Sequence, residues 1–200
     1  MRHESDVFQN NLEKGETINW MEYPQPFRLV EEDNKKSLYL RWILTPVIAI
    51  LLIVICIILA QTQNRIMYLI VFPAIMIAAA FCVCLKPMLD AHILRNNRTY
   101  IITDRRVILV KSGNFYSLPL EKINEVRFVR RKNGYEDVIF GKPALQKPYT
   151  KVRKLAISPI EKPNGPMGAI IGGAFYNISD AEKIKTLLAP GTIISGFSRN

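Results

Sequence analysis

One block of the chain, residues 42–85, contains a single charged residue, Arg65, and this block limits what the chain can fold into. It holds two apolar runs, residues 42–60 and 66–85, each about 20 residues long. A helix needs about that length to cross a hydrocarbon core about 30 Å thick. Helices of a soluble core carry a polar face at every third or fourth position, and neither run has one. The block therefore predicts two membrane spans and excludes an ordinary soluble globular protein.

A short polar connection, residues 61–65, separates the two runs and predicts that the spans form an antiparallel hairpin. Arg65 is the only basic residue of this connection, whereas basic residues flank the other ends of both spans. These residues are Lys35, Lys36, Arg41, Lys86, Arg95 and Arg98. Because basic flanks stay on the inner side, both termini are predicted to be cytoplasmic, in a multi-pass protein of the cell (inner) membrane. A long arm precedes the first run, so a cleavable signal peptide is not expected.

Charge divides the 200-residue chain, whose net charge is +10, into unlike parts. Residues 1–41 carry 6 basic and 8 acidic residues, a net charge of −2. Residues 86–200 carry 20 basic and 9 acidic residues, a net charge of +11. We therefore expect four parts, which are a cytoplasmic N-terminal arm (1–41), a transmembrane hairpin (42–85), a basic cytoplasmic domain (86–190) and a flexible tail (191–200).

Beyond residue 98 the pattern changes to the alternation of apolar and polar side chains that is typical of strands. Asn133-Gly134 can supply the positive φ angles of a type I′ turn and is predicted to join two strands in a hairpin. The predicted strands cover residues 99–103, 106–110, 115–118, 124–131 and 135–140, with further strand material in 152–160 and 167–178. This spacing predicts a mainly-β domain, a small sandwich or barrel of about seven antiparallel strands.

One helix is predicted near the C-terminus. Ser179 and Glu182 have the spacing of a capping box in which Ser179 is the N-cap. Apolar side chains then recur at helical spacing until Pro190-Gly191 ends the helix. We expect this helix to close one open end of the barrel, and the residues from Thr192 onward to be poorly ordered.

The basic domain lacks the residue types that most catalytic and metal sites require. Its one histidine, His92, lies beside the end of the second span, and its acidic residues show no ligand spacing. The cysteines all lie within the predicted spans, at Cys56, Cys82 and Cys84. We therefore expect no enzyme activity, no bound metal and no cofactor.

Two basic clusters are the candidate contacts of the domain with a lipid surface or a partner. The first contains Arg127, Arg130, Arg131 and Lys132, and the second contains Lys147, Lys151, Arg153 and Lys154. Close to an anionic leaflet, each such side chain contributes about 1 kcal/mol to membrane binding. The same clusters also fit a solvated surface that follows the positive-inside bias. Nucleic-acid binding is not expected, because a membrane tether restricts access and no nucleic-acid module accompanies the charge.

Four stretches of the chain resemble bacterial membrane proteins in which a PH-like (pleckstrin-homology-like) domain follows a two-helix transmembrane hairpin. They are residues 15–20 with Gly15-Glu16 and Trp20, residues 97–107 with Tyr100, Thr103 and Arg106, residues 134–141, and residues 175–181. The resemblance implies a bent barrel of seven antiparallel strands capped by a C-terminal helix. It also implies a protein-interaction or self-assembly module without catalytic residues.

Together these observations predict a membrane-anchored interaction or scaffold protein. It would be an accessory subunit of a membrane complex or a self-assembling module, with another membrane protein or a second copy of the chain as its partner and membrane lipids around its hairpin. The alternative is a sensor of anionic lipid that uses the basic clusters. A channel or transporter is not expected, because the two spans contain no charge that could line a pathway.

Overall fold

The computed structural model of the chain describes residues 12–63, 69–96, 98–148, 151–188 and 192–198. The chain divides into two compact units. Arg28–Ala91 form one unit, called here the helical unit. Met1–Phe27 and His92–Asn200 together form the other, called here the sheet unit.

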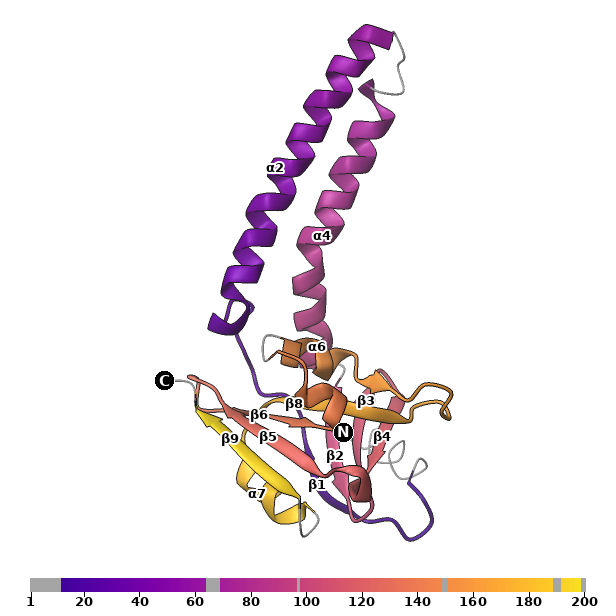
Figure 1. Cartoon of the computed structure of the whole chain (residues 1–200), viewed down its shortest axis with the longest axis vertical. Helices are drawn as coiled ribbons and strands as arrows, with labels where there is room; N and C mark the ends of the chain where they lie inside the picture. Colours follow the sequence, from indigo (N-terminus) through magenta and orange to yellow (C-terminus); the bar gives the residue numbers. More distant parts are fainter. Residues whose placement is uncertain (1–11, 64–68, 97, 149–150, 189–191, 199–200) are drawn as a thin grey trace. The chain divides into compact units, whose positions relative to one another are not determined.

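The helical unit consists of two long helices, α2 (Glu32–Gln63) and α4 (Val71–Asn96), of which α4 continues into the sheet unit for its last turn (Figure 1). Both are long and apolar enough to cross a membrane. Only 11% and 6% of their most apolar stretches are buried, unlike the core helices of a soluble protein. The indole Nε1 of Trp42 donates a hydrogen bond to the carbonyl of Cys84 at 3.2 Å, and this bond joins the two helices.

The helix bounds differ from the predicted spans. α2 begins ten residues before Trp42 and continues through Gln61 to Gln63, so part of the predicted connection is helical. α4 begins at Val71 and continues past Leu85 to Asn96, although Pro87 lies inside it. The rest of the predicted connection, residues 64 and 65, lies outside the described residues.

Sheet A contains four antiparallel strands in the order β1-β2-β3-β4. They are β1 (Ile18–Glu22), β2 (Arg98–Thr103), β3 (Arg106–Lys111) and β4 (Asn114–Pro119). Ser112 and Gly113 both have positive φ angles, 47° and 84°, so this dipeptide forms the type I′ turn between β3 and β4. β1 comes from the N-terminal arm and pairs with β2, with Ile18 opposite Thr103, so β1 forms an edge of the sheet.

Sheet B contains five strands in the order β7-β8-β6-β5-β9. They are β5 (Glu125–Arg130), β6 (Glu136–Phe140), β7 (Ile160–Glu161), β8 (Ile170–Ile178) and β9 (Ile193–Ser198). β9 runs parallel to β5, with Glu125 opposite Ile193. The sequence analysis assigned these residues to a poorly ordered tail, and the structure places them in a strand that extends the sheet.

The turn between β5 and β6 differs from the type I′ turn that was predicted at Asn133-Gly134. Only Gly134 has a positive φ, 88°, and its N–H donates to the carbonyl of Arg131 at 3.1 Å. The Arg131 N–H in turn donates to the carbonyl of Tyr135 at 2.8 Å. This pattern fits a type I turn followed by a left-handed glycine.

Two short helices, α5 (Lys142–Leu145) and α6 (Val152–Ile157), follow β6. The prediction of strand material in residues 152–157 is therefore wrong. The buried residues Val152, Leu155 and Ala156 recur at helical spacing, which places one face of α6 against β8. The segment is too short for its alternation to decide between a helix and a strand.

The C-terminal helix α7 (Ala181–Leu187) is confirmed, but its cap is not the predicted one. Asp180 is the N-cap, and its carboxylate accepts a hydrogen bond from the Lys183 N–H at 3.3 Å. Ser179 instead donates its N–H and its hydroxyl to Glu22, at 2.6 and 2.7 Å. Its predicted stop, Pro190-Gly191, lies outside the described residues.

The core lies within the sheet unit, where aromatic rings from different strands meet. The ring of Phe175 stacks on Trp20 and Tyr100, with centroids 5.5 and 4.7 Å apart, and meets Phe140 edge-on at 5.2 Å. A single bridge, Ser117 to Ala169, joins β4 to the segment before β8. In the described part of the chain, nine strands form two sheets and no closed barrel, so the prediction of seven antiparallel strands in a barrel is corrected.

Candidate functional site

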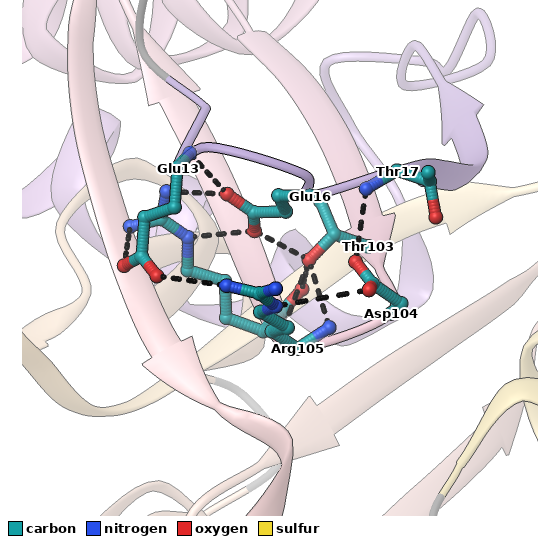
Figure 2. A network of polar contacts seen from close by, with 7 residues as sticks. Glu13, Glu16, Thr17, Thr103, Asp104 and Arg105 are labelled. Carbon is teal, nitrogen blue, oxygen red and sulfur yellow. Dashed lines mark hydrogen bonds and ion pairs between the residues drawn. The ribbon is translucent and has the colours of Figure 1, made fainter.

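A buried carboxylate fastens the N-terminal arm to sheet A. Glu16 Oε1 accepts hydrogen bonds from the Thr103 hydroxyl at 2.7 Å and from Arg106 Nε at 2.9 Å. Glu16 Oε2 accepts from Arg106 Nη2 at 2.7 Å and from the backbone N–H of Glu13 at 2.8 Å. Figure 2 shows these contacts, which we call the Glu16 network. The side chain of Glu16 is fully buried, so its charge depends on these four donors.

The Glu16 network alters the acidity of its two main members. Burial alone would raise the pKa of Glu16, but the hydrogen bonds from Arg106, the Glu13 amide and Thr103 lower that pKa to about 2. The same hydrogen bond to Glu16 raises the pKa of Arg106. The pair therefore stays ionised over the whole physiological range of pH.

Hydrogen bonds between Thr17 and Asp104, beside the Glu16 network, extend the pairing of β1 with β2 by one residue on each strand. The backbone N–H of Thr17 donates to Asp104 Oδ1 at 2.9 Å, and the Asp104 N–H donates to the carbonyl of Thr17 at 3.1 Å. Arg105 and the exposed Glu13 form a looser ion pair at 3.6 Å (Figure 2). These contacts close the loop that leads from the arm into β1.

A second buried carboxylate, Asp137 on β6, organises sheet B. Asp137 accepts two hydrogen bonds from the guanidinium of Arg131, at 2.8 and 2.7 Å, and one from the Asn177 N–H at 2.8 Å. The guanidinium also lies 4.1 Å from the centre of the Tyr176 ring. Asn177 donates through its amide to the carbonyl of Gln25 at 2.8 Å, which ties the arm beyond β1 to β8. We call these contacts the Asp137 network.

The two networks contain residues from all four stretches that carry the family resemblance. Glu16, from the first stretch, meets Thr103 and Arg106 from the second. Asp137, from the third stretch, meets Asn177 from the fourth. In this chain these motif residues serve the architecture, because they join distant segments of the sheet unit.

One of the eight predicted basic contacts, Arg131, is thus buried, with 6% of its side chain exposed. Two others also contact the protein. Arg127 Nη1 donates to the carbonyl of Leu145 at 3.3 Å. Arg153 Nε donates to the Tyr176 hydroxyl at 3.2 Å, and the Arg153 guanidinium lies 4.7 Å from the centre of the Phe27 ring.

The other five predicted contacts are exposed. They are Arg130 and Lys132 beside the β5–β6 turn, and Lys147, Lys151 and Lys154 around α6. The clusters seen in the sequence therefore do not form one uniform basic face, since strand alternation turns Arg131 inward and Arg130 outward. The three lysines around α6 keep the exposure that a lipid contact requires.

A hydrogen bond connects α6 to the residues that directly follow α4 in the chain. The buried guanidinium of Arg98 donates from Nη2 to the carbonyl of Ile157, the last residue of α6. Burial lowers the pKa of Arg98 to about 10, although the neighbouring Tyr100 and Tyr116 act in the opposite direction. Arg98 follows the end of α4 at Asn96 by two residues, so a single side chain links the end of that helix to α6.

An open groove of about 430 Å³ runs along β1. All five residues of β1 line it, together with Ser179, Asp180 and Lys183 at the start of α7. Along β1, Ile18 and Met21 are 38% and 39% exposed. Among the described strands none pairs with the second edge of β1, so backbone groups remain available there for an added strand.

The sequence analysis missed this groove because it treated the arm as one segment without strands. The sequence Ile18-Asn19-Trp20-Met21-Glu22 does not alternate strictly between apolar and polar side chains, and the strand contains an irregularity between Ile18 and Trp20, so the local signal for β1 was weak. Nothing local could reveal the other residues that line the groove, which come from the start of a helix more than 150 residues later.

Within the described ranges, no group of three or more His, Cys, Asp and Glu side chains is placed to hold a metal ion. Comparison of the chain with protein-family models, with curated proteins and with solved structures finds no match. The function must therefore be argued from the geometry of the site.

Proposed function

We propose that this chain is a membrane-anchored PH-like interaction protein, an accessory subunit of a membrane complex or a self-assembling module. In this proposal α2 and α4 cross the cell membrane as a hairpin, both termini are cytoplasmic, and the sheet unit binds the partner. The proposal assigns binding, and no catalysis, to the sheet unit.

The observation that carries the proposal is the open groove beside β1. The buried carboxylates of Glu16 and Asp137 are satisfied within the sheet unit and hold the arm in place. The arm therefore presents β1 as an ordered strand with one edge open, and ordered strand edges are a common means of protein recognition. A membrane hairpin adds to this by keeping the sheet unit at a high local concentration near other membrane proteins.

Site-specific photocrosslinking of the full-length protein in its own membrane tests the proposal. A photoreactive residue replaces Asn19 in the groove, and a matched variant carries it at Asn114, the exposed first residue of β4. We expect a discrete adduct from position 19 and none from position 114. No adduct from position 19, together with only monomers in mild detergent, would contradict the proposal.

A second candidate function is the recognition of anionic lipid. The observation that favours it is the exposure of Lys147, Lys151 and Lys154 around α6, whose last carbonyl is bound by Arg98. If α4 crosses the membrane, the chain passes from the membrane into the sheet unit just before Arg98, and this candidate assigns the three lysines to lipid phosphates. Arg131 takes no part in this candidate, because Asp137 already binds its guanidinium.

Lysine labelling of the full-length protein in lipid nanodiscs tests this second candidate. We expect the three lysines around α6 to react several-fold more slowly with a water-soluble amine reagent in discs with phosphatidylglycerol than in discs of phosphatidylcholine. Lys122 and Lys162, both exposed elsewhere on the sheet unit, are the internal controls. Equal protection of all these lysines would contradict specific docking of α6.

A further inference from the structure

Asn133 and Asn164 are each followed by glycine, and these are the two Asn-Gly dipeptides of the chain. Glycine carries no side chain that could hinder the approach of its backbone nitrogen to the preceding asparagine. We infer that Asn164 is a site of spontaneous deamidation in the folded protein, whereas Asn133 is protected. This modification is independent of the interaction function proposed above.

The reaction at Asn164 needs water and no other co-reactant. The backbone nitrogen of Gly165 attacks the side-chain carbonyl carbon, Cγ, of Asn164 and loses its proton. The bond between Cγ and Nδ2 breaks, and Nδ2 leaves as ammonia, so that a succinimide ring forms. Water then opens the ring at either carbonyl and gives aspartate or isoaspartate. Both products carry a carboxylate in place of a neutral amide, and isoaspartate also lengthens the backbone by one carbon.

The two glycine nitrogens are held alike, so they do not distinguish the two sites. The Gly134 N–H donates to the carbonyl of Arg131, and the Gly165 N–H donates to the carbonyl of Lys162, both at 3.1 Å. Each of these bonds closes a short turn between two antiparallel strands, β5 and β6 in the first case and β7 and β8 in the second. A difference in reactivity must therefore come from the asparagine side chains.

The side chain of Asn133 is held by both of its polar atoms. Nδ2 donates to Oδ1 of Asn177 at 2.9 Å, and Oδ1 accepts from the Tyr135 N–H at 3.2 Å. Asn177 is fully buried, and its own N–H donates to the Asp137 carboxylate. Cγ of Asn133 therefore cannot rotate toward the Gly134 nitrogen without breaking these hydrogen bonds, which slows the attack.

The side chain of Asn164 is exposed, and within the described residues no hydrogen bond fixes it. The φ angle of Asn164 is 57°, which together with the bond from Gly165 to Lys162 fits the third position of a type II turn after Pro163. A Cβ at position 165 would lie 2.9 Å from Cβ of Lys162, so this turn requires glycine after Asn164. The fold thus keeps an unhindered nitrogen beside a side chain that is free to rotate.

Peptide mapping by mass spectrometry of the full-length protein in detergent tests the inference. One sample is incubated in mildly alkaline buffer, and a matched sample is incubated in the same buffer with concentrated guanidinium chloride. In the folded protein we expect deamidation at Asn164 to be at least tenfold faster than at Asn133. In the denatured protein we expect the two rates to agree within threefold, because the hydrogen bonds that hold Asn133 are lost.

Enzymatic methylation of isoaspartate gives a second readout on the incubated, folded protein. We expect Asn164→Gly, which keeps a residue suited to the positive φ angle, to remove most of the incorporated methyl label. The matched variant Asn133→Gly is expected to leave the label within twofold of the wild type. Equal rates at the two sites in the folded protein, or reaction of Asn164 only after denaturation, would overturn the inference.

Discussion

The carboxylate of Glu16 and the guanidinium of Arg106, ninety residues apart in the chain, form a two-point contact at 2.9 and 2.7 Å. Glu16 lies just before β1, and Arg106 is the first residue of β3. The contact therefore holds the arm against sheet A. In this way it also fixes the position of β1 and of the groove beside it.

Glu16→Gln is expected to lower the stability of the sheet unit by about 2 kcal/mol, because it replaces charge-assisted hydrogen bonds with neutral ones. Thermal unfolding of the full-length protein in detergent measures the change, which corresponds to a Tm lower by about 5 °C. Glu13→Gln is the matched control, since the Glu13 side chain is 59% exposed and its ion pairs are 3.5 Å or longer. Equal effects of the two variants would show that the Glu16 contact contributes little.

The same carboxylate predicts how stability depends on pH. The pKa of Glu16 is about 2 in the folded protein, against a usual value of 4.5. Because the folded-state pKa is the lower one, its contribution is fully present above about pH 4.5 and is lost as the pH falls through about 2. The difference in Tm between the wild type and Glu16→Gln is therefore expected to shrink below pH 4.5. A difference that stays constant down to pH 2 would contradict this assignment.

Arg131→Ala is expected to destabilise the sheet unit by about 3–5 kcal/mol, because it leaves the buried charge of Asp137 without its main partner. The exposed neighbour Arg130 is the control, and Arg130→Ala is expected to change stability by less than about 0.5 kcal/mol. Chemical denaturation followed by tryptophan fluorescence compares them. A double variant, Arg131→Met with Asp137→Asn, tests whether the two residues act as a pair. If its loss of stability equalled the sum of the losses from Arg131→Met and from Asp137→Asn alone, the two residues would not interact.

Gly168 and Gly113 separate the effect of backbone conformation from that of steric contact. Both have positive φ angles, 79° and 84°. A Cβ atom at Gly168 would lie 2.1 Å from the carbonyl oxygen of Phe115, whereas a Cβ at Gly113 meets no atom within 4 Å. Gly113→Ala is expected to cost about 1–2 kcal/mol from the backbone alone. Gly168→Ala is expected to cost about 1–3 kcal/mol more, because it forces apart the bridge between β4 and the start of β8. Equal losses of stability would contradict the close approach.

The two apolar helices and the β2–β3–β4 meander could be predicted from the sequence because each depends on local properties. A run of apolar residues is a property of the run itself, and the meander pairs neighbouring segments joined by short turns. The turn type was less predictable. Ser112-Gly113 adopts the type I′ conformation, and Asn133-Gly134 does not.

What the sequence by itself determined is therefore the separation of an apolar helical part from a basic, strand-rich part. Only the tertiary structure decided that the arm supplies β1, that residues 193–198 pair in parallel with β5, and that residues 152–157 are helical. It also decided that Arg131 is buried in an ion pair with Asp137, whereas Arg130 is exposed. The reason is that short segments take the conformation and register that distant neighbours impose, and a charge is buried or exposed according to the partner it finds.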